Sequence, residues 1–197
     1  MIEIVNKEEF FLRKQEFIDA ILKGAVFIYP TDTIYGIGCN ALDNAAVAKI
    51  RAIKRRADAP FSVIAPSKEW ITDNCIVDVK AEEWIAKLPG PYTLVLKVKS
   101  RGKRGEGSVS DSVTHRAATL GIRIPDHWFS EIVSELGVPI VTTSVNESGE
   151  RHATSAEDIP ESISKNVSFM IDEGVKKGSP STVVDLGSSA VKVKERK

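Results

Sequence analysis

The feature that most constrains this chain is a short apolar run that ends at a proline and continues as a hydroxyl-rich loop. The run is Ala25 to Tyr29, bounded by Gly24 and Pro30. Apolar residues in this setting are typical of a strand covered on both faces, and pairing should stop at Pro30 because proline has no N–H to donate. The loop that follows contains Thr31, Asp32, Thr33, Tyr35, Gly36 and Gly38.

Binding groups in α/β sheets collect beyond the carboxyl ends of strands, and glycine lets the backbone approach a ligand closely. This stretch therefore predicts a buried strand that leads into a binding loop. From these residues alone, a polar turn between two elements is the alternative interpretation.

Size and composition indicate a globular protein. The chain has 197 residues, of which 42% are hydrophobic and 27% charged, and we expect a single domain over residues 1–197. No apolar run approaches the length of a bilayer span, and the N-terminus lacks a charged region followed by an apolar one. We therefore expect a cytoplasmic protein with no membrane association. Cys39 and Cys75 lie far apart with no C-x-x-C spacing, which predicts buried thiols.

The charge balance is even. Lysine plus arginine number 27 and aspartate plus glutamate 27, so the chain lacks the basic excess that non-specific nucleic-acid binding needs. Basic residues concentrate locally at Arg51–Arg56 and Lys97–Arg104. Such clusters are usually solvated faces unless an anionic ligand lies beside them.

Helix and strand patterns alternate irregularly. Helical patterns cover 6–24, 43–56, 79–88, 125–136 and 155–164, and a brief helix opens at Ser67. Asn6 and Asp43 are the expected N-caps of the first two helices. Strand patterns cover 25–29, 61–64, 93–98, 120–124, 138–141, 167–171, 183–186 and 190–193. We expect an α/β fold with a twisted mixed β-sheet flanked by helices. The segment 99–107 has no periodicity and is expected to be an exposed, mobile loop.

A second strand-end loop, 142–149, repeats the hydroxyl-rich design of the first. Arg123 stands inside a predicted strand, where a guanidinium group needs an anion. Together with Lys54 and Arg56 at a helix end, these groups suit an anionic ligand. For Lys54 and Arg56 the alternative is that basic residues in a last helical turn complement the helix macrodipole.

Standard catalytic motifs are missing. His115, His127 and His152 are not at metal-ligand spacings, and there is no G-x-S-x-G sequence. The glycine-rich stretch 102–108 lacks the G-x-x-x-x-G-K-[ST] order, which excludes a P-loop NTPase.

Six segments carry more specific information: Pro30–Ile37, Ile53–Arg56, Leu88–Thr93, Gly121–Asp126, Thr143–Gly149 and Pro180–Asp185. In this order they resemble the motifs of the YrdC/TsaC family, in its short single-domain branch. Members of that family are L-threonylcarbamoyladenylate synthases, nucleotidyltransferases that join L-threonine, bicarbonate and ATP and release pyrophosphate. Their product supplies the threonylcarbamoyladenosine modification at position 37 of tRNA.

The resemblance implies an open sheet with a large concave, positively charged cavity. All three substrates carry negative charge, so the cavity needs cations together with hydroxyl or amide donors. The threonine amine becomes a carbamate whose oxygen attacks the α-phosphorus, so no protein nucleophile is required. Mg²⁺ is implied on the ATP phosphates, with no metal ligand from the protein. A weak tRNA contact and a downstream threonylcarbamoyl-transferase complex are the other implied partners.

Site residues follow from the resemblance position by position. Lys54 and Arg56 correspond to the K-x-R pair near the phosphates and carbamate, as catalytic and ATP-binding residues. The S-x-N motif beside the nucleotide corresponds to Ser144 and Asn146. The other implied nucleotide-side residues are Thr119, Ser181 and Thr182, and the implied threonine-binding residues are Thr33, Tyr35, Arg123 and Thr142.

Two positions depart from the family pattern. Ala65 stands where longer relatives carry a histidine, and Val145 replaces the usual alanine, which affects the expected threonine site. One alternative function is a double-stranded RNA- or tRNA-binding module of the same fold, but the charge balance and an aromatic content of 7% argue against it. The other alternative is a sister branch without synthase activity, which the intact K-x-R and S-x-N motifs disfavour.

Overall fold

The structure is a computed structural model that describes residues 2–56, 58–99, 108–115, 117–188 and 190–196. The strands in these residues are β1 (Glu3–Val5), β2 (Phe27–Tyr29), β3 (Gly36–Gly38), β4 (Ser62–Ile64), β5 (Tyr92–Lys97), β6 (Thr119–Arg123), β7 (Ile140–Ser144), β8 (Phe169–Ile171), β9 (Thr182–Asp185) and β10 (Lys192–Lys194). The helices are α1 (Lys7–Leu12), α2 (Lys14–Leu22), α3 (Asn44–Lys54), α4 (Lys68–Asn74), α5 (Val79–Ala86), α6 (Asp111–Thr114), α7 (Phe129–Leu136) and α8 (Glu161–Ser164), with a 3-10 turn, η1, at Ala156–Asp158.

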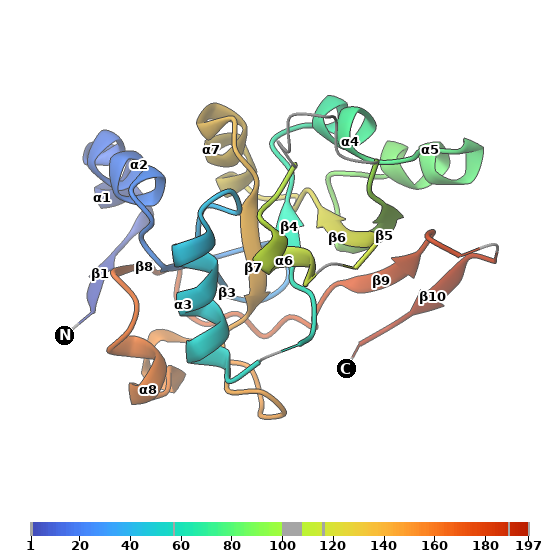
Figure 1. Ribbon diagram of the computed structural model, residues 1–197. Coiled ribbons are helices and arrows are strands. Elements are labelled where there is room, and N and C mark those ends of the chain that lie inside the picture. Colours follow the sequence, from blue (N-terminus) through green and yellow to red (C-terminus); the bar gives the residue numbers. More distant parts are fainter. Residues whose placement is uncertain (1, 57, 100–107, 116, 189, 197) are drawn as a thin grey trace.

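The strands of the described residues join one mixed sheet in the order β1-β8-β2-β3-β7-β4-β6-β5-β9-β10 (Figure 1). The pairs β1–β8, β2–β8, β4–β6 and β5–β9 are parallel, and the others are antiparallel. In the view of Figure 1, α1, α2, α7, α4 and α5 lie along the upper side of the sheet and α3 and α8 along the lower side. The predicted α/β fold, an open twisted mixed sheet flanked by helices, is confirmed.

The central strand β2 is buried on both faces, as predicted. Successive residues of a strand point to opposite faces. Phe27 and Tyr29 accordingly pack in a cluster with aromatic residues of α1, α2 and α7, while Ile28 joins a larger cluster that includes Val47 and Ile50 of α3. The strand thus ties the two layers of helices to the sheet.

The glycines after β2 serve a different purpose from the predicted one. Gly36 and Gly38 are the ends of β3, antiparallel to β2, and a Cβ on either residue would lie 2.9 Å from the ring of Tyr29. On Gly38 a Cβ would also lie 2.3 Å from the carbonyl oxygen of Val141. Although Gly36 lines the cavity described below, the immediate reason for glycine at both positions is the tyrosine ring rather than a ligand.

Strand β7 is longer than predicted. The pattern predicted a strand over 138–141 followed by a loop, whereas the structure continues the strand through Thr142, Thr143 and Ser144. These residues stay extended because Thr142 pairs with Ser62 of β4, while Thr143 and Ser144 pair with β3. The hydroxyl-rich segment is therefore held by two neighbouring strands.

Two predicted helices are each divided in the structure. The helix expected over 6–24 breaks at Arg13, whose φ of −110° and ψ of 23° are not helical and whose guanidinium is held by ion pairs to Glu3 and Glu16. The predicted cap is confirmed, because Asn6 accepts from the N–H of Glu9 at 2.8 Å. The helix expected over 155–164 is η1 and α8, separated at Pro160, which disfavours helical backbone in the residue before it.

The shorter elements, the cysteines and the segment 99–107 differ in how far the sequence predicted them. The short elements β1 and α6 were not predicted, since three and four residues carry no resolvable periodicity. Cys39 and Cys75 are buried free thiols, as predicted. The expected mobile loop over 99–107 lies, from residue 100 onward, outside the described residues. No helix in the described part of the chain is long and apolar enough to cross a membrane.

Candidate active site

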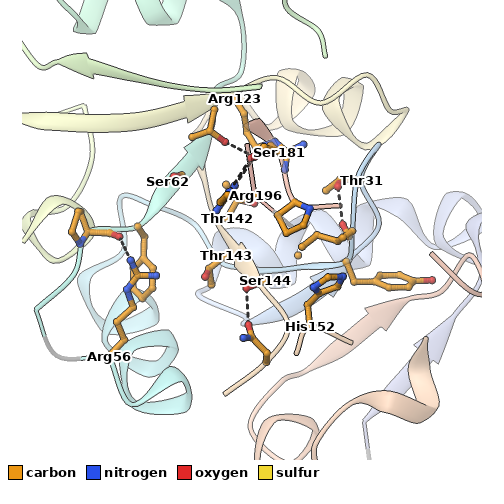
Figure 2. A pocket seen from close by; sticks show the side chains of 18 of the residues that line it. Thr31, Arg56, Ser62, Arg123, Thr142, Thr143, Ser144, His152, Ser181 and Arg196 are labelled. Atoms are coloured by element: carbon orange, nitrogen blue, oxygen red, sulfur yellow. Dashed lines mark hydrogen bonds between the residues drawn. The ribbon is translucent and has the colours of Figure 1, made fainter. Parts of the chain in front are cut away.

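A cavity of about 290 Å³ lies over the adjacent strands β3, β7, β4, β6 and β5 (Figure 2). Its wall is formed mainly by hydroxyl and amide groups together with three arginines. The lining residues are Thr31, Ile34, Tyr35, Gly36, Arg56, Pro60, Phe61, Ser62, Thr93, Arg123, Thr142, Thr143, Ser144, Asn146, Glu150, His152, Pro180, Ser181 and Arg196. The predicted site residues among them are Tyr35, Arg56, Arg123, Thr142, Ser144, Asn146 and Ser181.

Arg123 ends β6 and is only 5% exposed. Its Nη2 donates to Oδ1 of Asp32 at 2.6 Å and to Oγ1 of Thr33 at 3.2 Å, and Asp32 also accepts from the N–H of Asp126 at 3.1 Å. The prediction that this buried arginine needs an anion is confirmed, and the anion is a side chain of the first loop. Burial lowers the pKa of Arg123, and the charge of Asp32 offsets part of that effect. The Nε of Arg123 is buried with no hydrogen-bond partner in the described structure.

Arg56 and Arg196 bring two further guanidinium groups to the wall (Figure 2). Arg56 follows α3 and donates from Nη2 to the carbonyl of Pro60 at 2.9 Å. Arg196 donates from Nε to the carbonyl of Ser181 at 2.8 Å and from Nη2 to its Oγ at 2.7 Å. Partial burial and the nearby positive charges lower the pKa of both arginines. A bound anion would relieve this repulsion, so the electrostatics favour a negatively charged ligand.

Lys54 is not one of the lining residues, although it is the buried end of α3 at 3% exposed. Its ammonium donates to the carbonyl oxygens of Ser144 and Asn146 at 2.6 and 2.7 Å and to Oδ1 of Asn146 at 2.7 Å. Burial, followed by the charge of Arg56, lowers the pKa of Lys54 to about 8. An ammonium fixed to the end of β7 does more than complement a helix dipole, because it holds the S-x-N segment in place.

The S-x-N segment itself is ordered by side-chain hydrogen bonds. The Oγ of Ser144 donates to Oδ1 of Asn146 at 2.6 Å, and Nδ2 of Asn146 donates to the carbonyl of Glu150 at 2.7 Å. Asn146 is therefore oriented from three directions, by Ser144, Glu150 and Lys54. Such preorganised polar groups can bind a charged substrate with little rearrangement.

Tyr35 lines the cavity with its ring, while its hydroxyl faces the segment after β8. The hydroxyl has two acceptors within reach of its single hydrogen, Oδ1 of Asp172 at 2.8 Å and the carbonyl oxygen of Gly174 at 2.7 Å. It also accepts a hydrogen bond from the N–H of Glu173 at 2.8 Å. Burial raises the pKa of Tyr35. The tyrosine thus joins the first loop to the segment 172–174, and its hydroxyl is engaged there.

Glu173 anchors the same segment from the other side. Its carboxylate accepts a hydrogen bond from Nε1 of Trp128, lies 3.0 Å from Nε2 of His127 and pairs with Lys176 at 2.9 Å. Burial alone would raise the pKa of Glu173, but these partners outweigh it and lower the pKa to about 2. The carboxylate is therefore ionised at any pH at which the protein would be assayed.

Three further predicted residues do not line the cavity. Thr33 is buried under the first loop, where its Oγ1 accepts from Arg123. Thr119 begins β6 opposite Lys97, and Thr182 begins β9 with its N–H bonded to the carbonyl of Pro91 at 2.9 Å. Thr33 therefore contacts Arg123 and does not face the cavity wall. The nucleotide-binding roles of Thr119 and Thr182 stay predictions.

Arg196 and His152 are two of the lining residues that were not predicted as site residues. Arg196 reaches the cavity through the β9–β10 hairpin, which pairs Lys192 with Asp185 and Lys194 with Val183 and so returns residue 196 to Ser181. His152 was considered only as a metal ligand, and its place follows from the loop after β7, which has no periodic pattern.

The described residues contain no group of three or more His, Cys, Asp or Glu side chains that could hold a metal ion. The carboxylate among the lining residues is that of Glu150, which is exposed.

Comparison with known proteins agrees with this geometry. A model of the Sua5, YciO and YrdC family, described as "Telomere recombination", matches residues 19–196. A protein of Methanocaldococcus jannaschii named "Putative threonylcarbamoyl-AMP synthase" is 38% identical over an alignment of 180 residues, and the match covers 89% of this chain and 79% of that protein.

Solved structures share the fold. The crystal structure of P. abyssi Sua5 complexed with L-threonine is 32% identical with a TM-score of 0.81, and the match covers 98% of this chain but 56% of Sua5. This chain therefore spans little more than half the length of Sua5. The crystal structure of E. coli YciO is 26% identical with a TM-score of 0.80, and the match covers 100% of this chain and 94% of YciO. The family match, the sequence identity and these likenesses show that the chain belongs to the family of Sua5, YciO and YrdC proteins.

Proposed function

We propose that this protein is an L-threonylcarbamoyladenylate synthase, which forms threonylcarbamoyl-AMP from L-threonine, bicarbonate and ATP and releases pyrophosphate. The observation that carries the proposal is the convergence of Arg56, Arg123 and Arg196 on one hydroxyl-lined cavity of about 290 Å³. Three cations around so small a space suit a set of substrates that are all anionic. The 38% identical relative, by name a threonylcarbamoyl-AMP synthase, supports the same activity.

Arg123 binds the threonine carboxylate in this proposal. Asp32 and Thr33 already hold its Nη2, while its buried Nε has no partner in the described structure. The guanidinium lines the cavity and would donate to a carboxylate bound there, and a hydrogen bond to a charged group of this kind is worth about 1.5–3 kcal/mol. The bound threonine in P. abyssi Sua5 supports an amino-acid site in the family, and Thr142 lines the cavity on the same sheet.

Arg56 and Arg196 bind the phosphates of ATP, beside the S-x-N segment that Lys54 orients. The threonine nitrogen first bonds to the carbon of bicarbonate, giving a carbamate with loss of water. A carbamate oxygen then bonds to the α-phosphorus, and the bond from that phosphorus to pyrophosphate breaks. The arginines stabilise the charge that develops on the phosphate oxygens, so the protein acts by positioning and electrostatics.

Mg²⁺ enters as the companion of ATP and, when bound to its phosphates, neutralises part of their charge. Within this function, tRNA contact is weak, and the product passes to a downstream threonylcarbamoyl-transferase complex.

The RNA-binding alternative fits the geometry less well. Arg123 is 5% exposed and Arg56 faces a cavity, whereas duplex RNA is recognised by exposed basic surfaces that reach phosphates and 2′-hydroxyls.

The proposal is tested by pyrophosphate release with each substrate omitted in turn. We expect release only when L-threonine, bicarbonate and ATP are all present, because the carbamate is the nucleophile. Equal release without threonine would show that the cavity hydrolyses ATP or uses another acceptor.

A further inference from the structure

Arg51 lies in α3, three residues before Lys54 and outside the K-x-R pair. Its guanidinium reaches backbone carbonyls of two separate segments. Nε and Nη2 donate to the carbonyl of Ser112 in α6 at 2.8 and 2.6 Å. Nη1 donates to the carbonyls of Arg56 and Ala59, both at 3.0 Å. One side chain therefore joins α3 and α6 to the turn that follows α3.

That turn forms one wall of the cavity. Arg56, Pro60, Phe61 and Ser62 all line it, and the turn begins where Arg55 leaves the helix with a φ of 48°. Its far end is held to α6, because the N–H of Phe61 donates to the carbonyl of Val113 at 2.9 Å. Arg51 holds the near end and the middle of the same turn.

The side chain of Arg56 depends on these contacts. It rests 5.3 Å from the centroid of the Phe61 ring and donates to the carbonyl of Pro60, while the guanidinium of Arg51 lies 4.7 Å from the same centroid. The ring and the carbonyl that support Arg56 thus belong to the turn that Arg51 fastens.

We propose that Arg51 is a positioning residue for the reaction, which holds the backbone at Arg56 and Ala59 so that the guanidinium of Arg56 faces the phosphates of ATP. This inference rests on the proposed function. The role requires arginine, because the planar fork of a guanidinium reaches three carbonyls at fixed angles, whereas a lysine ammonium keeps the charge without that geometry.

The test compares R51A and R51K with wild type in steady-state kinetics, with K49A as the matched control. Lys49 lies on the same helix and is exposed, so its variant removes one positive charge without touching the turn. For R51A we expect kcat/KM for ATP to fall about ten- to a hundredfold, since a small misplacement of a charged group costs this much. R51K should be impaired nearly as strongly, KM for threonine should stay within about twofold, and K49A should match wild type. Full activity of R51K, or a loss in R51A that appears in KM for threonine and not in kcat/KM for ATP, would overturn the positioning role.

A double-mutant cycle shows whether Arg51 acts through Arg56. If it does, R51A should cause little further loss of kcat/KM in an R56A background, because coupled residues are not additive. Losses that multiply in the double variant would refute the inference.

Amide hydrogen exchange adds a readout that needs no substrate. R51A should speed exchange at the N–H groups of Arg56 and Phe61, while K49A should not. Unchanged exchange would show that Arg51 does not hold the turn. Absence of pyrophosphate release by the wild-type protein would instead refute the proposed function and leave the exchange result to decide the role of Arg51.

Discussion

Deprotonation of Lys54 should reduce activity above about pH 8. Burial and the charge of Arg56 lower the pKa of this lysine to about 8, which places its titration inside the range of ordinary assays. As an ammonium it supplies three N–H donors to the three oxygens of Ser144 and Asn146 that surround it. The neutral amine has two, so one oxygen loses its donor and the S-x-N segment is no longer fixed from all sides.

The size of the effect follows from the geometry. A hydrogen bond to a charged group contributes about 1.5–3 kcal/mol. Losing one such bond on deprotonation is enough to free the carbonyl or amide oxygen that has lost its donor. If the neutral form is inactive, kcat/KM for ATP should fall about tenfold for each pH unit well above the pKa.

The free energy of unfolding should rise with pH over the range in which activity falls. The folded pKa lies below the ordinary value of 10.5, so between about pH 8 and 10.5 the unfolded chain binds more protons at this group than the folded protein does. The contribution of Lys54 to the free energy of unfolding therefore rises with pH across that range. Loss of activity while the melting temperature holds would separate the titration of Lys54 from unfolding.

The assay is kcat/KM for ATP from pH 7 to 10 for wild type and K54R, with melts at each pH. Arginine stays charged throughout, so the ratio of the two profiles cancels the ionisation of the substrates. The ratio should bend near pH 8. A ratio that is flat across the range would refute the assignment of the alkaline limb to Lys54.

Three further predictions address the rest of the site. R123K should raise KM for threonine at least tenfold and KM for ATP less than about threefold in steady-state assays, because lysine keeps the charge opposite Asp32 but lacks the planar fork of donors that suits a carboxylate. Equal effects on both substrates would contradict the carboxylate assignment. Glu173, with its pKa lowered to about 2 from 4.5, stabilises the fold above about pH 4.5 and loses that contribution as pH falls toward 2. The melting temperature of wild type should therefore drop more steeply than that of E173Q between about pH 5 and 3. Parallel melting curves for the two proteins would argue against a stabilising role of the Glu173 carboxylate. Binding of tRNA, followed by fluorescence anisotropy, should be weak and should vanish at moderate salt because the net charge is zero, whereas tight, salt-resistant binding would favour the RNA-binding module.

Strands and helix starts of this fold could be predicted where the local sequence pattern decides them. The apolar run at 25–29 contains β2, and the caps at Asn6 and Asp43 begin α1 and α3. Strand ends were less predictable where distant partners decide them. The residues from Thr142 to Ser144 read as a loop, and only pairing with β3 and β4 keeps them extended.

The site could be predicted in its composition but less in its contacts. The arginine inside a strand indicated an anion, yet no local pattern pointed to Asp32, 91 residues away. Lys54 was expected at the phosphates, and its hydrogen bonds to Ser144 and Asn146 depend on how α3 crosses the end of β7. Arg196 needed the hairpin register, which the predicted strands at 183–186 and 190–193 left undetermined.

The packing of Tyr29 against Gly36 and Gly38 changes how a shared motif should be weighed when proteins of this fold are compared. Each glycine leaves space for the tyrosine ring, so selection for a stable sheet alone would keep them. Retained glycines in a distant relative are then informative about its architecture and uninformative about its chemistry. Side chains that line the cavity from outside the strands, such as those of Arg56 and Arg196, are better markers for separating active enzymes from relatives that have lost the reaction.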